Sequence, residues 1–249
     1  MNWNESVEKI KKYVVRIETP QGWGTGFLFI YNEQRTLCGV ATANHVLQEA
    51  DLWQQPIRVR NLHTGSEVFL KVDERAIIRL PDNDLAVILF DADVLDFPKD
   101  LIALLPSEEA IGIGTEVGWL GFPNIDANTL CFFSGTISAR KESESAYLID
   151  GVAINGVSGG PVFFCSQASG IQIIGIVSAY HANRASGDAL PGLLIAQDVS
   201  KYHGVISHVH SVDEANREKQ AIEQVIENDV LGSDLPRHAK TKPTPTFTV

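Results

Sequence analysis

The chain has 249 residues, of which 44% are hydrophobic, and it carries a net charge of −11 at pH 7. Its length allows one large β domain or two small ones, and its apolar fraction is enough for a buried core. The charge argues against nucleic acid or an anionic membrane as the main partner, because both repel an acidic surface. No run approaches the roughly 18 to 20 apolar residues of a membrane span, so we expect no membrane association.

The three cysteines, Cys38, Cys131 and Cys165, are widely spaced and lie among apolar residues. They resemble small hydrophobic core residues more than a disulfide framework. This pattern is typical of a protein in a reducing compartment. The first residues lack a basic start followed by an apolar run, so we expect no secretory signal and a cytoplasmic location.

Residues 1–12 are predicted to hold a short helix, over residues 4–11, with Asn4 as its candidate N-cap. Residues 13–105 then contain short runs rich in Val, Ile and Phe, separated by turn residues. The six predicted strands are residues 14–18, 26–31, 57–61, 68–72, 76–80 and 85–90. Six strands of this length are typical of a small antiparallel barrel.

Residues 106–198 show the same pattern of short apolar runs separated by turn residues, which predicts a second barrel. Its six predicted strands are residues 116–120, 130–139, 146–150, 161–165, 172–179 and 193–196. We therefore predict an all-β fold of two six-stranded antiparallel barrels, with a short N-terminal helix and longer C-terminal helices.

The sequence changes character after Gln197, and residues 199–231 are predicted to be helical. The run Ser211-Val212-Asp213-Glu214 has the form of a capping box, which predicts a helix over residues 212–230 after a shorter one over 199–208. The apolar stripe of this helix either packs on its own domain, which we favour, or docks a regulatory protein. Residues 232–249 are expected to be a disordered tail.

One serine, Ser158, lies in a glycine-rich turn that leads into an apolar, strand-like segment. Such a turn can expose the hydroxyl group and point the backbone N–H groups of Gly156 and Ser158 the same way. Two such N–H groups can bind the negative oxygen that forms when a nucleophile attacks an amide carbonyl. A serine between glycines is a weak signal by itself, because loops contain many such pairs.

Two other segments supply the groups that a serine nucleophile needs. His45 follows a strand-like run, at a point where the chain turns, and its neutral imidazole could take the serine proton and return it to a leaving amine. Asp84 opens an apolar strand, where a buried carboxylate could hold the imidazole in one tautomer.

The order His45, Asp84, Ser158 and the neighbours of each resemble the signatures of the chymotrypsin-like (trypsin-fold) serine proteases. Two further segments, Gly22–Leu28 and Val117–Pro123, are similar to motifs of the disulfide-free intracellular and bacterial branch of that family. The resemblance covers roughly residues 12 to 200, and five ordered motifs are far more specific than one.

The resemblance implies a serine endopeptidase that hydrolyses peptide bonds through an acyl-enzyme on Ser158. His45 would be the general base and acid, and Asp84 would orient it. The N–H groups of Gly156 and Ser158 would form the oxyanion hole.

The resemblance also implies where the substrate residue before the scissile bond (P1) would bind. Val152 would lie at the base of that pocket, with Ser178, Ala179 and Tyr180 on one wall and Gly192 on another. Val152 is uncharged and Tyr180 replaces a small residue, so we expect narrow specificity with an apolar P1 residue of small to medium size. The strand edge at residues 178–180 would pair with the substrate backbone, and Ser178 matches a family serine beside the catalytic aspartate.

Val157 departs from the zymogen-activated members of the family, in which an aspartate precedes the serine. Because valine forms no ion pair with a new α-amino group, other contacts, a substrate or a partner must hold the turn. Val157 and Tyr180 leave a second hypothesis open, namely a catalytically silent trypsin-fold module that binds peptides.

We expect a protein or peptide substrate, no cofactor and no metal. His208 and His210, with His203 nearby, could present imidazoles to zinc, but no cysteine or carboxylate lies at ligand spacing. We therefore interpret these histidines as a solvated helix end.

Overall fold

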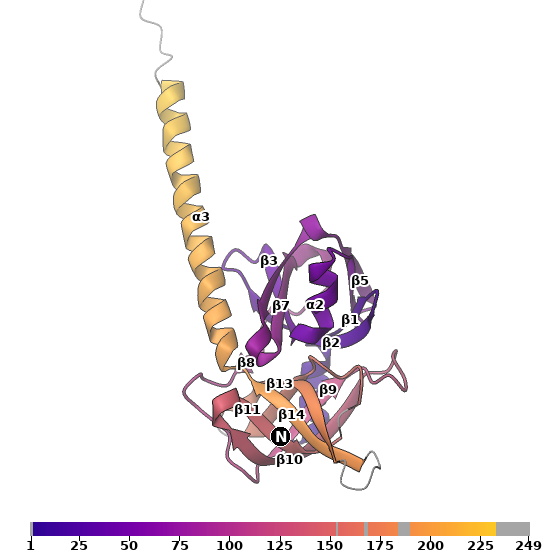
Figure 1. Cartoon of the computed structure of the whole chain (residues 1–249). Helices are drawn as coiled ribbons and strands as arrows, with labels where there is room; N and C mark the ends of the chain where they lie inside the picture. The colour runs from indigo at the N-terminus through magenta and orange to yellow at the C-terminus, as the bar shows by residue number, and fades with distance from the viewer. Residues whose placement is uncertain (1, 153, 167–168, 184–189, 233–249) are drawn as a thin grey trace, which may run out of the picture. The chain divides into compact units, whose positions relative to one another are not determined.

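The computed structural model describes residues 2–152, 154–166, 169–183 and 190–232 of the chain. The chain divides into two compact units, Met1–Val209 and His210–Val249. Both barrels lie in the first unit, and Figure 1 follows their strands from indigo to orange. The domain boundaries proposed above within this unit stay a prediction.

The N-terminal helix α1 spans Trp3–Ile10 and is followed by the 3-10 turn η1, Lys11–Tyr13. Its N-cap is Asn2, whose side chain accepts a hydrogen bond from the N–H of Glu5 at 2.9 Å. The prediction of Asn4 as the N-cap was wrong, because that residue already lies within the first turn of the helix.

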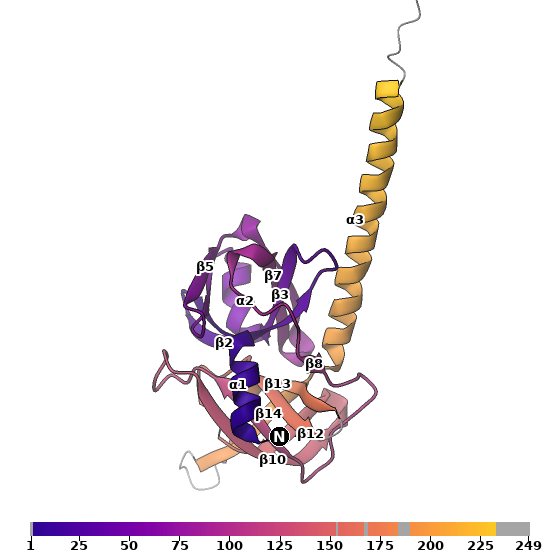
Figure 2. The same cartoon turned by 180° about the vertical axis from the view of Figure 1, so that it is seen from behind.

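Helix α1 packs against the second barrel through Trp3. The Trp3 ring lies 5.4 Å from that of Phe132 and 5.7 Å from that of Phe163, and its indole N–H donates to Glu116. Figure 2 shows α1 lying beside the strands of this barrel. The start of the chain therefore supports the half of the molecule that contributes Ser158.

The first barrel is a fully antiparallel sheet of seven strands in the order β5-β4-β1-β2-β3-β7-β6. The strands are β1 (Val14–Thr19), β2 (Gly22–Tyr31), β3 (Leu37–Ala43), β4 (Ile57–Asn61), β5 (Ser66–Leu70), β6 (Arg75–Leu80) and β7 (Leu85–Asp91). The helix α2 (Asn44–Leu52) and the 3-10 turns η2 (Val72–Glu74) and η3 (Pro81–Asn83) lie between these strands, and the 3-10 turn η4 (Ala92–Val94) follows β7. The seventh strand, Leu37–Ala43, is the strand-like run predicted before His45, and it pairs with both β2 and β7.

The second barrel contains seven further strands. They are β8 (Ala103–Leu104), β9 (Glu116–Gly121), β10 (Cys131–Lys141), β11 (Ala146–Asp150), β12 (Pro161–Ser166), β13 (Gly170–Asn183) and β14 (Leu190–Asp198), with the 3-10 turn η5 (Glu142–Glu144) after β10. A pairing between β12 and β13 closes six of them into a barrel in the order β12-β9-β10-β11-β14-β13, and β8 adds in parallel to the edge of β13. The predicted all-β double barrel is confirmed.

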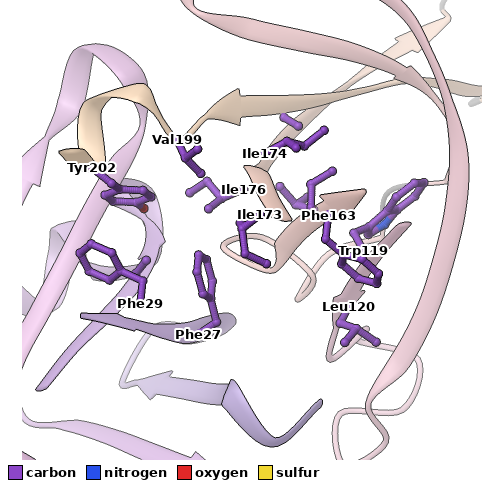
Figure 3. Close-up of a cluster of buried hydrophobic side chains, with 14 of the residues drawn as sticks. Phe27, Phe29, Trp119, Leu120, Phe163, Ile173, Ile174, Ile176, Val199 and Tyr202 are labelled. Atoms are coloured by element: carbon purple, nitrogen blue, oxygen red, sulfur yellow. The ribbon is translucent and has the colours of Figure 1, made fainter. Parts of the chain in front are cut away.

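One cluster of buried hydrophobic side chains extends through both barrels (Figure 3). The residues labelled in that view are Phe27 and Phe29 of β2, Trp119 and Leu120 of β9, Phe163 of β12, Ile173, Ile174 and Ile176 of β13, and Val199 and Tyr202. A shared close-packed core resists relative movement of the two barrels. Side chains from different barrels can therefore form one rigid site.

Helix α3 is one continuous helix, Ser200–Gly232. The prediction of two helices with a new start at Ser211 was wrong, because no glycine or proline lies between residues 205 and 231 to interrupt the helix. The helix begins instead at Ser200, whose backbone N–H and hydroxyl donate to the carboxylate of Asp198. Gly232, the first residue of the predicted tail, ends α3, and the rest of that tail, residues 233–249, lies outside the described part of the chain.

The first turns of α3 belong to the first unit and pack onto its core. Val199, Tyr202, Val205 and Val209 are at most 6% exposed. The hydroxyl of Tyr202 donates to the carbonyl of Thr42 in β3, at 3.3 Å. The packing role predicted for the C-terminal segment therefore holds for residues 199 to 209.

Candidate active site

His45 lies in the first turn of α2, directly after β3. The N-cap position of this helix is Ala43, which has no side-chain oxygen to bind the unpaired N–H groups of the first turn. Asp84 binds two of them from another part of the chain. Its carbonyl accepts from the N–H of Asn44 at 2.9 Å, and its carboxylate accepts from the N–H of His45 at 3.0 Å. A carboxylate at this place also interacts favourably with the helix dipole.

The backbone of Asp84 has a left-handed conformation, with φ of 49°, between η3 and β7. Aspartate is one of the few residues besides glycine that adopt this conformation readily. The pairing of Leu85 with Ala43 then places the start of β7 beside the end of β3. Local backbone geometry and strand register together bring the carboxylate of Asp84 to His45.

The imidazole of His45 binds the Asp84 carboxylate through Nδ1, which lies 2.9 Å from Oδ2 and 3.1 Å from Oδ1. An ionised carboxylate only accepts hydrogen bonds, so Nδ1 carries the proton and Nε2 is left as a base. The Ser178 hydroxyl donates to Oδ2 at 2.5 Å, in agreement with the place predicted for it.

The Asp84 carboxyl stays ionised at neutral pH. Burial acts to raise its pKa, but hydrogen bonds from His45 and Ser178 outweigh that effect, and the pKa lies below the usual 3.8. The negative charge stabilises an imidazolium at His45 whenever that ring accepts a second proton.

Ser158 and His45 line the same cavity, which has a volume of about 360 Å³. The cavity is also lined by Gly156, Thr19, Gln21, Gly22, Trp23, Val46, Glu49, Asn124 and Asn155. The first barrel thus contributes the imidazole and the second barrel the serine.

The turn around Ser158 requires its glycines. Gly156 and Gly159 have φ of +94° and +84°, a region that favours glycine. A Cβ atom on Gly156 would lie 2.3 Å from the carbonyl oxygen of Phe122, and one on Gly159 would lie 2.1 Å from that of Thr25. Space and backbone conformation both exclude a side chain at these two positions.

The predicted P1 pocket is described only in part. Val152 is 47% exposed and is not among the described residues that line the cavity. Ala179 and Tyr180 lie in β13, opposite Ile195 and Leu194 of β14. Gly192 lies in β14. The side chains of residues 179–192 are outside the described part of the structure, so the pocket stays a prediction.

The sequence model described as trypsin-like peptidase domain matches residues 24–176, which is more than half of the chain. The chain belongs to the trypsin-like peptidase family. The substrate of this peptidase is accordingly a protein or peptide. None of the curated proteins matches its sequence.

Two solved structures share the fold of this peptidase. A serine-to-alanine mutant of Rv3671c from M. tuberculosis H37Rv, in an inactive form, matches with a TM-score of 0.57 and 18% identity, over 83% of this chain and 91% of that one. A serine endoprotease from Yersinia pestis matches with a TM-score of 0.61 and 19% identity, over 84% of this chain and 66% of that one. At these identities the likeness shows the fold alone, and it agrees with the double barrel.

Several residues that line the cavity of the peptidase were not predicted from the sequence, among them Trp23, Glu49 and Asn155. Trp23 lies inside a recognised motif, but nothing in the motif indicates that its ring faces the site. Glu49 lies one helical turn after His45 on α2, so the helical spacing could have indicated it.

The described residues show neither a metal-binding cluster of His, Cys, Asp or Glu nor a helix long and apolar enough to cross a membrane. His203 hydrogen-bonds through Nε2 to the carbonyl oxygen of Leu105 at 2.8 Å. The three cysteines are free thiols.

Proposed function

We propose that this peptidase is a serine endopeptidase with Ser158 as nucleophile, His45 as general base and acid, and Asp84 as the group that orients His45. The supporting observation is that His45, whose imidazole binds Asp84, lines one cavity together with Ser158 although the two residues come from different barrels. A tautomer with its proton on Nδ1 leaves Nε2 free to accept the proton of Ser158.

In the first half of the reaction, Oγ of Ser158 attacks the carbonyl carbon of the scissile peptide, and its proton moves to Nε2 of His45. The N–H groups of Gly156 and Ser158 bind the negative oxygen of the tetrahedral intermediate. The C–N bond then breaks, the amine takes the proton from Nε2, and an ester remains on Ser158.

In the second half, water attacks the ester carbonyl while Nε2 of His45 accepts its proton. The same two N–H groups bind the second tetrahedral oxygen. Collapse of this intermediate returns the proton to Oγ of Ser158 and releases the acid product.

The proposed specificity is narrow, with an apolar P1 residue of small to medium size. It rests on the uncharged side chain of Val152, which offers no partner for lysine or arginine. The competing function is a silent trypsin-fold module that binds peptides without cutting them. Against it, Val157 is buried in the core beneath Gly121, so the serine turn has a support that needs no ion pair.

One peptide library tests both the activity and the specificity. We expect the wild-type chain to cleave a subset of peptides after small or medium apolar residues, and Ser158→Ala to bind the same peptides uncut. Cleavage after lysine or arginine would contradict the specificity. Binding by both chains without turnover of any peptide would establish the silent module.

We also propose that residues 210–232 of α3 dock a regulatory protein with a basic surface. These residues fall in the second compact unit, where Val212, Ile222 and Ile226 are 45%, 60% and 56% exposed. Residues 211–230 hold six acidic and two basic side chains. Such a surface would attract a basic partner, and salt would weaken the attraction.

A chain that ends at Val209 tests this role, because it retains the buried hydrophobic residues that the structure describes in α3. We expect it to stay folded and to cleave small peptides as the full chain does, but to lose salt-sensitive capture of proteins from a cell extract. Tyr202→Ala serves as the contrasting variant, since removal of this buried ring should cost about 3 to 5 kcal/mol of stability. Equal capture by the short and the full chain would contradict docking.

A further inference from the structure

Thr25, in strand β2 of the first barrel, holds the turn that carries Ser158 in the second barrel. Thr25 is fully buried. Its hydroxyl donates to the carbonyl of Gly156 at 2.8 Å and accepts from the N–H of Phe122 at 3.0 Å. Its backbone N–H donates to the carbonyl of Ser158 at 2.8 Å. One residue therefore binds two carbonyl groups of the turn.

These bonds complete a set that fixes four consecutive peptide planes. The carbonyl of Asn155 accepts from the N–H of Asn124 at 2.8 Å, and that of Val157 accepts from the N–H of Gly160 at 2.9 Å. In a trans peptide the N–H points opposite to the carbonyl of the same plane. The carbonyls of Asn155 and Val157 therefore set the directions of the N–H groups of Gly156 and Ser158. The carbonyl of Gly156, which the Thr25 hydroxyl binds, belongs to the peptide plane between these two.

Of these four carbonyls, that of Gly156 accepts a hydrogen bond from a side chain, the hydroxyl of Thr25. The other three carbonyls accept from backbone N–H groups. The hydrogen bond from Thr25 restrains the peptide plane that follows Gly156. A restraint is needed there because glycine restricts its own backbone dihedrals less than any other residue. The position of Thr25 is itself held, because the hydroxyl of Thr42 donates to the carbonyl of Thr25 at 2.7 Å. Thr42 belongs to β3, the strand that leads to His45.

We propose that Thr25 is a positioning residue whose hydroxyl holds the oxyanion-binding N–H groups of Gly156 and Ser158 in their active orientation. It takes the place of the ion pair that Val157 does not form. The inference rests on the proposed function, because it assumes that a tetrahedral intermediate forms on Ser158.

Two substitutions separate the hydroxyl from the shape of the side chain. Thr25→Val keeps the shape and removes the hydroxyl, and Thr25→Ser keeps the hydroxyl and removes the methyl group. Because loss of one oxyanion donor costs about 10²- to 10³-fold in kcat, we expect a misplaced donor in Thr25→Val to cost about 10- to 100-fold. KM should change little, and Thr25→Ser should recover most of the wild-type kcat.

The inhibition constant of a peptide aldehyde distinguishes positioning from a purely structural role, because a purely structural role of Thr25 would leave this constant unchanged. Ser158 adds to the aldehyde carbon and leaves a tetrahedral oxygen at the two N–H groups, so its inhibition constant reports on their orientation. We expect this constant to rise in Thr25→Val by the factor lost in kcat. Affinity for an uncut peptide, measured with Ser158→Ala present in both chains, should stay the same.

Thermal unfolding of each variant shows whether it is folded. If Thr25→Val does not fold, Thr25→Ala takes its place in these measurements. A folded Thr25→Val with wild-type kcat and aldehyde affinity would overturn the role of Thr25 and leave the proposed function intact. Equal losses in Thr25→Ser and Thr25→Val would overturn it as well. A wild-type chain that neither cleaves peptides nor binds the aldehyde would overturn the proposed function, and this inference with it.

Discussion

Ser158→Ala is expected to lower kcat on a cleavable peptide by about 10⁶-fold, because no acyl-enzyme forms without the hydroxyl. Some catalysis over water should remain, since the oxyanion-binding N–H groups and the binding cleft are retained. Initial rates on a chromogenic peptide measure the loss, and labelling by a fluorophosphonate shows whether the serine is activated.

Ser107→Ala is the matched control, because Ser107 is exposed and does not line the cavity. It should keep full activity and labelling. Labelling that persists in Ser158→Ala, or a wild-type chain that takes no label under any condition, would show that Ser158 is not the nucleophile.

Asp84→Asn is expected to lower kcat by about 10⁴-fold at neutral pH. The amide can place its NH₂ group at Nδ1 of His45, which moves the ring proton to Nε2 and removes the base that Ser158 needs. Asparagine adopts the left-handed conformation of position 84 as readily as aspartate does, so the backbone should stay unchanged. Asp82→Asn, an exposed change two residues earlier, should leave kcat unchanged.

The lowered pKa of Asp84 gives this substitution a defined pH dependence. A carboxyl whose pKa is lower in the folded than in the unfolded chain stabilises the fold above the unfolded value of about 3.9, and this stabilisation is lost as the pH falls through the folded pKa. Urea unfolding should therefore show the wild type more stable than Asp84→Asn at neutral pH. The difference should shrink below pH 3.8.

The activity profile gives a second measurement of the same charge. Because Asp84 stays ionised, its protonation should add no second inflection to the fall in kcat/KM on acidification at any pH above 3.8. A second inflection in that range would contradict the lowered pKa of Asp84.

The sequence by itself determined the class of fold and the three candidate catalytic residues, because both depend on local patterns. Alternating apolar residues between turn signals predict short strands, and the turn around Ser158 needs glycines whatever surrounds it. Helix boundaries were less accurate. Asn4 and Ser211 have the residue type of an N-cap, but residue type alone does not show where a helix starts.

Only the tertiary structure decided how these residues are held. Asp84, which the sequence already predicted to orient His45, also binds the backbone N–H of His45 from 39 positions away. The Thr25 hydroxyl binds the carbonyl of Gly156 across 131 positions. Neither hydrogen bond can be predicted from the neighbouring residues in the sequence. A threonine within a strand has the same sequence context whether its hydroxyl is bound or not. The bond of Thr25 restrains the peptide plane between the two oxyanion-binding N–H groups, and it forms only when the two barrels share one core.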